Sequence, residues 1–231
     1  MLSPIDDLDR FRTTRTSWHT LAERVLAPAR HAATGRIGLR PTPAGIGTPP
    51  FSEGRTLAIE GAELVVNAGD VTTRSPITTL RAAAEAAGID PGSETGLYTP
   101  STPDDPDARL VVDPDMAAVL RDWFALGNRV LLAWSAAHPD DRPSEIQLWP
   151  EHFDLALDLG PDSGRANYGA SPGDGDHESP YLYVGPWTPN DNEFWNAGTY
   201  ARLGYEELRA DTHPAQLAAH FFAEGYAAAN S

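Results

Sequence analysis

The segment between Trp149 and Trp187 constrains the fold more than any other part of this sequence. From Phe153 to Leu159, apolar residues alternate with polar or small ones, which is the period of a half-buried β-strand. If residues 181–187 also form a strand, one of its sides carries Tyr181, Tyr183, Gly185 and Trp187, and the other side carries Leu182 and Val184. If the two strands pair, one face of a sheet carries a histidine, carboxylates, an asparagine and aromatic rings. This face is the predicted functional surface.

The alternation assigns each side chain of the first strand to a face. The side expected to face the core carries Phe153, Leu155, Leu157 and Leu159, and the opposite side carries His152, Asp154, Ala156 and Asp158. The predicted ligand-binding set combines polar groups with aromatic walls: His152, Asp154, Asn167, Tyr183 and Trp187. Two structural alternatives stay open. Aromatic residues of this kind more often close a core, and Asp154 can instead accept backbone N–H bonds from a neighbouring turn.

A metal site is an alternative use of the same face. His152 and Asp154 are two residues apart, a spacing that suits a histidine–carboxylate pair acting on a metal or as a general base. A third ligand would come from the turn at Asp174–Glu178, which gives His152, Asp154 and His177 as candidate metal ligands. That turn lacks the oxygen spacing of an EF-hand, and turns rich in glycine and aspartate are usually hairpin loops. The sequence identifies no catalytic residue and no cofactor.

The charge balance argues against two classes of partner. The chain has 33 acidic and 17 basic residues and a formal net charge of -16, so it is expected to repel phosphate backbones and anionic lipids. All the basic residues are arginines and cysteine is absent, which excludes a thiol nucleophile, a Schiff-base lysine and a phosphate-loop lysine. The acidic start of the chain lacks the apolar core of a signal peptide, and no apolar run is long enough to span a membrane. We expect a cytoplasmic protein.

Helix and strand patterns alternate along the chain. Helices are predicted for residues 17–33, 78–87 and 113–136, and after residue 211. Gly35 is expected to stop the first of these helices. Asp113 is expected to cap the third, with Pro114 at its first position. Strands are predicted for residues 36–40, 56–60, 63–67 and 71–74, the middle two forming a hairpin. Residues 41–50 are either a loop or an irregular edge strand, and residues 200–208 fit a strand or a helix.

These elements predict the α+β class. Two groups of strands, each flanked by helices, indicate a largely antiparallel sheet packed by N-terminal, central and C-terminal helices. At 231 residues the chain suits one α+β domain over residues 1–231. Residues 91–107, dense in proline, aspartate, serine and threonine, are expected to be a surface loop within it.

Three motifs of the central segment resemble those of a bacterial, actinobacterial-type family of unknown function. They are the run Trp-Pro-Glu-His-Phe-Asp-Leu-Ala from Trp149, the Asn167–Asp174 segment ending in Pro-Gly-Asp, and the strand from Tyr181 to Trp187. The order of the upstream elements is also similar, so the resemblance covers most of the chain. It implies no activity. Members of the family need not carry histidine at position 152, which weakens a catalytic role for His152 and leaves Asp154 unaffected.

Three functions fit these observations. The leading hypothesis is a small-molecule-binding protein whose pocket lies over the sheet of residues 149–187. The second is a metal-assisted hydrolase or isomerase that uses His152 and Asp154 with His177 or Asp174. The third is a protein-interaction module without a ligand, in which the aromatic strand faces a partner. The sequence predicts no oligomeric state.

Overall fold

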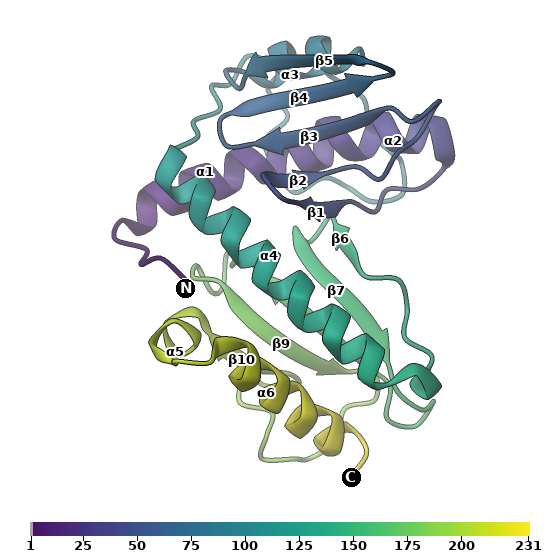
Figure 1. The fold of residues 1–231 in the computed structure, drawn as a ribbon, viewed down its shortest axis with the longest axis vertical. Helices are drawn as coiled ribbons and strands as arrows, with labels where there is room; N and C mark the ends of the chain where they lie inside the picture. The colour runs from purple at the N-terminus through teal and green to yellow at the C-terminus, as the bar shows by residue number, and fades with distance from the viewer. Residues whose placement is uncertain (1) are drawn as a thin grey trace. The chain divides into compact units, whose positions relative to one another are not determined.

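The computed structural model describes residues 2–231 and shows an α+β fold with two five-stranded antiparallel sheets (Figure 1). The strand orders are β1-β2-β3-β4-β5 and β10-β9-β8-β7-β6. The chain divides into two compact units. The N-terminal unit comprises Ile5–Asp122 and Leu148–Phe153, and the C-terminal unit comprises the residues up to Pro4, Trp123–Gln147 and Asp154–Ser231. The predicted α+β class is confirmed, whereas the single domain over residues 1–231 stays a prediction.

The first helical segment of the N-terminal unit is longer than predicted. It consists of α1 (Leu8–Leu21), a π-helical turn η1 (Ala22–Leu26) and α2 (Ala27–Thr34). The helix begins early because the Asp7 carboxylate accepts a hydrogen bond from the Arg10 N–H at 3.0 Å and caps it. It ends as predicted at Gly35, whose φ of 70° is in the left-handed region.

The strands of the N-terminal unit form a sheet of hairpins. Their bounds are β1 Arg40–Thr42, β2 Gly45–Gly47, β3 Thr56–Glu60, β4 Glu63–Ala68 and β5 Val71–Pro76. The predicted strand at residues 36–40 is confirmed only at its end, where Leu39 bridges Leu148 and Arg40 starts β1. Residues 36–38 are irregular, and the Arg30 guanidinium donates to the Gly38 carbonyl. Proline at position 41 is tolerated because β1 is an edge strand, which supports the edge-strand alternative for residues 41–50.

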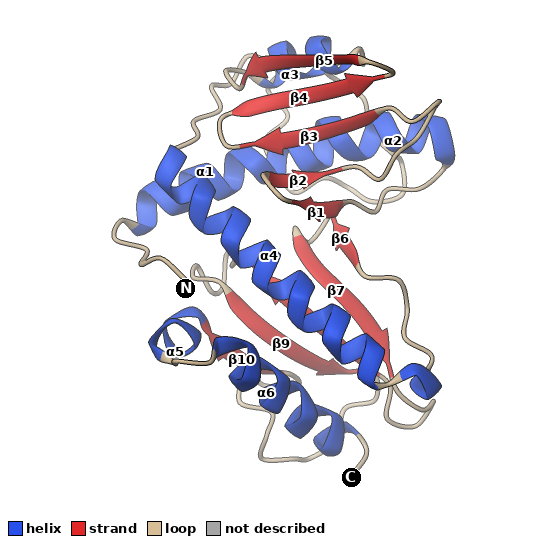
Figure 2. Ribbon diagram, in the orientation of Figure 1, coloured by secondary structure: helices blue, strands red, loops and turns tan. Residues whose placement is uncertain are grey.

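Helices cover one face of this sheet (Figure 2). The helix α3 (Leu80–Ala87) contacts β4 and the π-helical turn, and it begins at Thr79, whose hydroxyl caps it. The Trp18 indole N–H donates to the Gly61 carbonyl at 3.1 Å, which joins α1 to the turn between β3 and β4. The core beneath the helices is apolar and fully buried: Trp18, Leu21, Ile46, Leu57, Ile59, Leu64, Leu80 and Ala84.

The second sheet carries the segment that the sequence singles out. Its strands are β6 Gln147–Trp149, β7 Asp154–Leu159, β8 Ala166–Ser171, β9 Tyr181–Pro186 and β10 Ala201–Gly204. The helices are α4 (Pro114–Ala137), a 3-10 turn η2 (Pro139–Asp141), α5 (Tyr205–Ala210) and α6 (Pro214–Ala229). Residues 200–208 therefore hold the whole of β10 and the start of α5, which explains their mixed pattern.

Aromatic packing joins the helices of the C-terminal unit to one face of its sheet. The Trp134 ring on α4 lies 5.4 Å from Tyr168 on β8 and 6.0 Å from Phe222 on α6, measured between ring centroids. The helix α6 contacts β8, β9 and β10. The helices of this unit therefore pack on one face of the sheet, which is its core face. Among the described residues, no helix has the length and apolar character needed to cross a membrane.

Candidate functional site

The predicted faces of the central sheet are confirmed from Asp154 onward. Leu155, Leu157 and Leu159 are buried and pair with Ala170, Tyr168 and Ala166, so they share the face that the helices cover. The alternation fails one residue earlier. Phe153 lies in a turn with a φ of 53°, and β7 starts only after it. His152 is therefore an exposed turn residue rather than a neighbour of Asp154 on a strand.

Asp154 and Tyr183 form a hydrogen-bonded pair on the polar face of the sheet. The Tyr183 hydroxyl donates to Asp154 Oδ2, and only 7% of Asp154 is exposed. The Tyr183 ring lies across Gly169, where a Cβ atom would overlap it. Burial, and then the charge of Asp154, raises the pKa of Tyr183 well above its usual value. Asp154 on β7 thus bonds across the intervening strand β8 to Tyr183 on β9, a residue that the sequence places on the same face.

Asn167 and Trp187 form a second pair on the surface. The Trp187 indole N–H donates to Asn167 Oδ1 at 2.9 Å, and 58% of Trp187 is exposed. Asn167 pairs with Asp158, which is four residues beyond Asp154, so Asn167 and Asp154 are about 13 Å apart along the strands. Four of the five predicted ligand-binding residues therefore form two hydrogen-bonded pairs in this sheet.

The candidate metal ligands do not gather. His177 lies in the loop between β8 and β9, where its N–H donates to Asp174 Oδ1 at 2.8 Å and its ring stacks edge-on against Tyr181. Burial lowers the pKa of His177. His152 and Asp154 fall in different units of the chain. Within residues 2–231, no three histidine, aspartate or glutamate side chains are grouped so that they could hold a metal ion.

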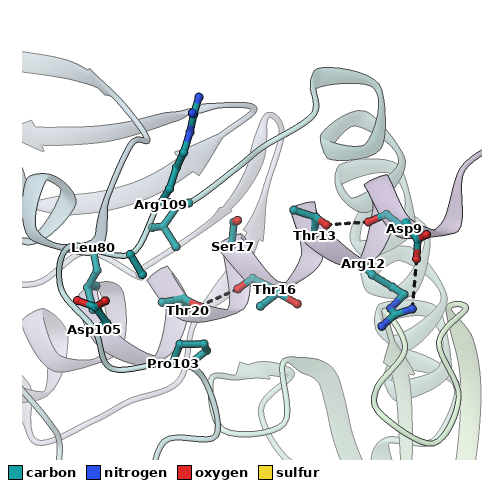
Figure 3. A pocket seen from close by; sticks show the side chains of 12 residues that line it. Asp9, Arg12, Thr13, Thr16, Ser17, Thr20, Leu80, Pro103, Asp105 and Arg109 are labelled. Carbon is teal, nitrogen blue, oxygen red and sulfur yellow. Dashed lines mark hydrogen bonds and ion pairs between the residues drawn. The ribbon is translucent and has the colours of Figure 1, made fainter.

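A pocket lies in the N-terminal unit. Its volume is about 420 Å³, within the range of small-molecule sites. One wall is a row of side chains that we call the hydroxyl face of α1: Thr13, Thr16, Ser17 and Thr20 (Figure 3). Apolar groups and charged groups complete the lining: Leu80, Pro103, Ala108, Leu110, Asp9, Arg12, Asp105 and Arg109.

The hydroxyls of this wall have defined roles as donors and acceptors. Thr13 donates to the Asp9 carbonyl at 2.8 Å and Thr20 to the Thr16 carbonyl at 2.9 Å. Their oxygen lone pairs can therefore still accept hydrogen bonds. The Ser17 hydroxyl donates to the carbonyl of Val111 and accepts from its N–H, which holds the chain just after Leu110 against α1.

The opposite wall, residues 103–110, is held by the start of α3. The Arg81 N–H donates to the Pro106 carbonyl at 2.8 Å, and the Leu110 N–H donates to the Thr78 carbonyl at 2.9 Å. The Arg81 guanidinium also bonds both carboxylate oxygens of Asp107, at 2.7 and 2.9 Å. In Figure 3, Leu80, Pro103 and Asp105 lie near Thr20, and Asp9 and Arg12 lie at the other end of the row. The pocket is thus polar along α1 and charged at both ends.

A pair of adjacent residues in the π-helical turn anchors the loop that leads into this wall. The buried Glu23 carboxylate, 1% exposed, accepts the N–H groups of Ser101 and Thr102. A terminal nitrogen of the Arg24 guanidinium donates to the Thr102 carbonyl oxygen at 2.6 Å. The predicted loop at residues 91–107 lacks helix and strand, and Glu23 and Arg24 fasten it in the interior just before Pro103. π-helical turns often occur at functional sites.

The hydroxyl face of α1 was missed because the predicted helix began too late. Its residues follow the spacing i, i+3, i+4 and i+7, which is one face of an α-helix. An N-cap at Asp7 places all four on the same side, whereas a start at Ser17 leaves two of them in a loop. The signal that could have identified this face was Asp7 followed by Asp9 in the first turn.

His19 gives the N-terminal unit a pH-dependent stability. The Nε2 atom of His19 lies 2.9 Å from the Pro150 carbonyl oxygen, and the ring stacks on Phe153 with 4.8 Å between ring centroids. Burial lowers the pKa of His19. Glu23 partly opposes this shift, whereas the positive charges of Arg15 and His152 add to it. The unfolded chain, with a histidine pKa of about 6.5, then binds a proton more readily than the folded protein. Stability should therefore fall as the pH drops below about 6.5.

Urea unfolding at pH 7.5 and at pH 5.5 measures this effect. His19→Gln should lose less stability between the two pH values than the unchanged protein does. The matched control is His220→Gln on α6, where 70% of the histidine side chain is exposed. An equal loss in the His19→Gln variant and the unchanged protein would rule out the assignment to His19.

Comparison of the chain with family models, with curated proteins and with solved structures gave no match. The geometry described above is therefore the basis for any function assigned to this protein.

Proposed function

We propose that this protein binds a small polar molecule, and that the pocket along the hydroxyl face of α1 is its binding site. The observation that carries the proposal is the 420 Å³ pocket with four hydroxyl-bearing residues on one helix face. This proposal keeps the binding function predicted from the sequence and moves it away from the sheet of residues 149–187. The predicted cytoplasmic location belongs to the same proposal.

The pocket chemistry favours a ligand with both hydrogen-bond donors and acceptors. Thr13 and Thr20 offer acceptor oxygens, because their protons are already donated to helix carbonyls. Arg12 and Arg109 supply donors and Asp9 and Asp105 supply carboxylates, so the lining charges balance. Leu80 and Leu110 add an apolar surface that can cover a carbon skeleton. A strongly charged ligand would leave one sign of these charges unmatched.

A panel of small polar compounds tests the proposal directly. Amino acids, monosaccharides, nucleosides and polyamines would be screened by ligand-observed NMR and by thermal unfolding. A ligand at about a hundred times its Kd adds about 2.7 kcal/mol of stability, which for a chain of this size raises Tm by about 5–10 °C. Failure of all four compound classes to bind would overturn the proposal.

Pocket-filling variants locate the site. Thr16 is exposed, so Thr16→Phe should leave the fold intact while its ring occupies the pocket, and binding should fall at least about tenfold. The matched control is Thr73→Phe on the exposed edge strand β5, which should bind as the unchanged protein does. Equal binding by both variants would show that the ligand sits elsewhere.

A further inference from the structure

A fixed aromatic surface lies on the C-terminal unit, in the segment just after β9. We call it the Trp187 platform; it consists of Trp187, Asn167 and Arg165. Within residues 2–231, Trp187 is the tryptophan with a largely exposed side chain, whereas Trp18 and Trp123 are fully buried. The Trp187 backbone N–H donates to the Arg165 carbonyl at 2.9 Å, so its backbone continues the β8–β9 pairing.

The ring of Trp187 is held from two directions. The indole N–H donates to Asn167 Oδ1 at 2.9 Å, which sets the orientation of the ring edge. The Arg165 guanidinium lies 5.3 Å from the ring centroid, in cation–π geometry. A ring held in this way loses little conformational entropy when a ligand stacks on it.

Arg165 is itself held by several hydrogen bonds and is paired with a carboxylate. Its Nε donates to Asp158 Oδ1 at 2.6 Å, and its two terminal nitrogens donate to the Gly160 carbonyl at 3.1 Å and the Arg142 carbonyl at 2.9 Å. The Arg165 side chain is 14% exposed and Asp158 is 24% exposed. The guanidinium thus supports the indole ring without giving the platform a net charge.

The unused groups of the platform define the ligand. The Asn167 carboxamide oxygen is occupied by the indole, and its amide nitrogen can donate two hydrogen bonds at the edge of the ring. A suitable ligand therefore has a flat apolar face bordered by acceptor oxygens. The pyranose ring of a hexose has both features. A cation is disfavoured because Arg165 already occupies the ring's cation site, and a net charge of -16 disfavours nucleic acids.

We propose that the Trp187 platform binds the pyranose ring of a hexose, stacked on the indole and hydrogen-bonded by the Asn167 amide. This site is separate from the pocket along α1 and does not depend on it. Stacking on one exposed ring gives weak binding, with a Kd of about 1 mM.

The experiment titrates four sugars (glucose, N-acetylglucosamine, cellohexaose and chitohexaose) and, for comparison, adenosine against the full chain, with saturation-transfer NMR as the readout. We expect binding that Trp187→Ala weakens at least about tenfold, that Trp187→Phe largely retains, and that Asn167→Ala weakens less. Leu132→Ala, which removes another exposed apolar side chain, is the control and should bind unchanged. Equal affinity for a single sugar and its hexasaccharide would indicate one bound ring, and tighter binding of the hexasaccharide would indicate an extended chain as ligand.

Three results would overturn the proposal: no binding of any of the four sugars, equal binding by the Trp187→Ala variant, or preferential binding of adenosine, a planar aromatic ring, in place of the sugars. Thr16→Phe separates this site from the pocket along α1. Sugar binding that Thr16→Phe abolishes and Trp187→Ala leaves unchanged would support the pocket and refute the platform.

Discussion

Gly169→Ala is expected to destabilise the C-terminal unit by about 3 kcal/mol, because the added methyl group takes the space of the Tyr183 ring. Gly169 faces Tyr183 directly in the β8–β9 register, and an aromatic ring lying over a glycine is a known way to stabilise paired strands. If the ring moves, the hydroxyl also leaves Asp154, and a buried charge-assisted hydrogen bond is lost.

Urea unfolding measures this loss, with Gly175→Ala as the control. Gly175 lies in the loop between β8 and β9, where an added Cβ atom has no neighbour within 4 Å. The double variant Gly169→Ala with Tyr183→Ala identifies the cause. Once the ring is removed, the alanine at position 169 should cost little more, so the two effects should not be additive. Fully additive effects would mean that the ring is not what Gly169 accommodates.

Glu23→Ala is expected to destabilise the N-terminal unit by about 3 kcal/mol, because two backbone N–H groups, one of them on the buried Thr102, lose their acceptor. The Ser101 N–H lies 3.1 Å from both carboxylate oxygens of Glu23, and the Thr102 N–H lies 2.9 Å from Oε2. Thr102 is 7% exposed, so water cannot readily replace the carboxylate. The loop should open locally even where the rest of the unit stays folded.

Urea unfolding gives the global loss, and hydrogen exchange at the amides of residues 101 and 102 gives the local one. Glu85→Ala on α3 is the matched control, since that glutamate is exposed and also lies on a helix. The Glu23→Ala variant should also bind the pocket ligand more weakly, because Pro103 follows the anchored residues directly. Unchanged exchange at the two amides would contradict the role given to Glu23.

Elements specified by neighbouring residues were predictable from the sequence. Asp113 caps α4 by accepting the N–H groups of Asp115 and Met116, as its position before Pro114 indicates. The hairpin of β3 and β4 turns at Gly61, which has a φ of 58°. The alternation after Asp154 also predicted that Tyr183 would share its face, since strand pairing preserves the two-residue period.

The tertiary structure decided how those elements combine. Glu23 bonds to residues 78 and 79 positions further along the chain, and Ser17 bonds to Val111 across 94 positions. No local pattern encodes such contacts, because they depend on the closure of long loops. His152 lies in a turn because the chain reverses at Phe153, and the pocket forms where residues 103–110 meet α1. The sequence by itself determined the fold class, the Asp113 and Gly35 caps and the two faces of β7. The tertiary structure determined the pocket and the pairing of the predicted site residues, because these depend on side chains that meet only after the chain has folded.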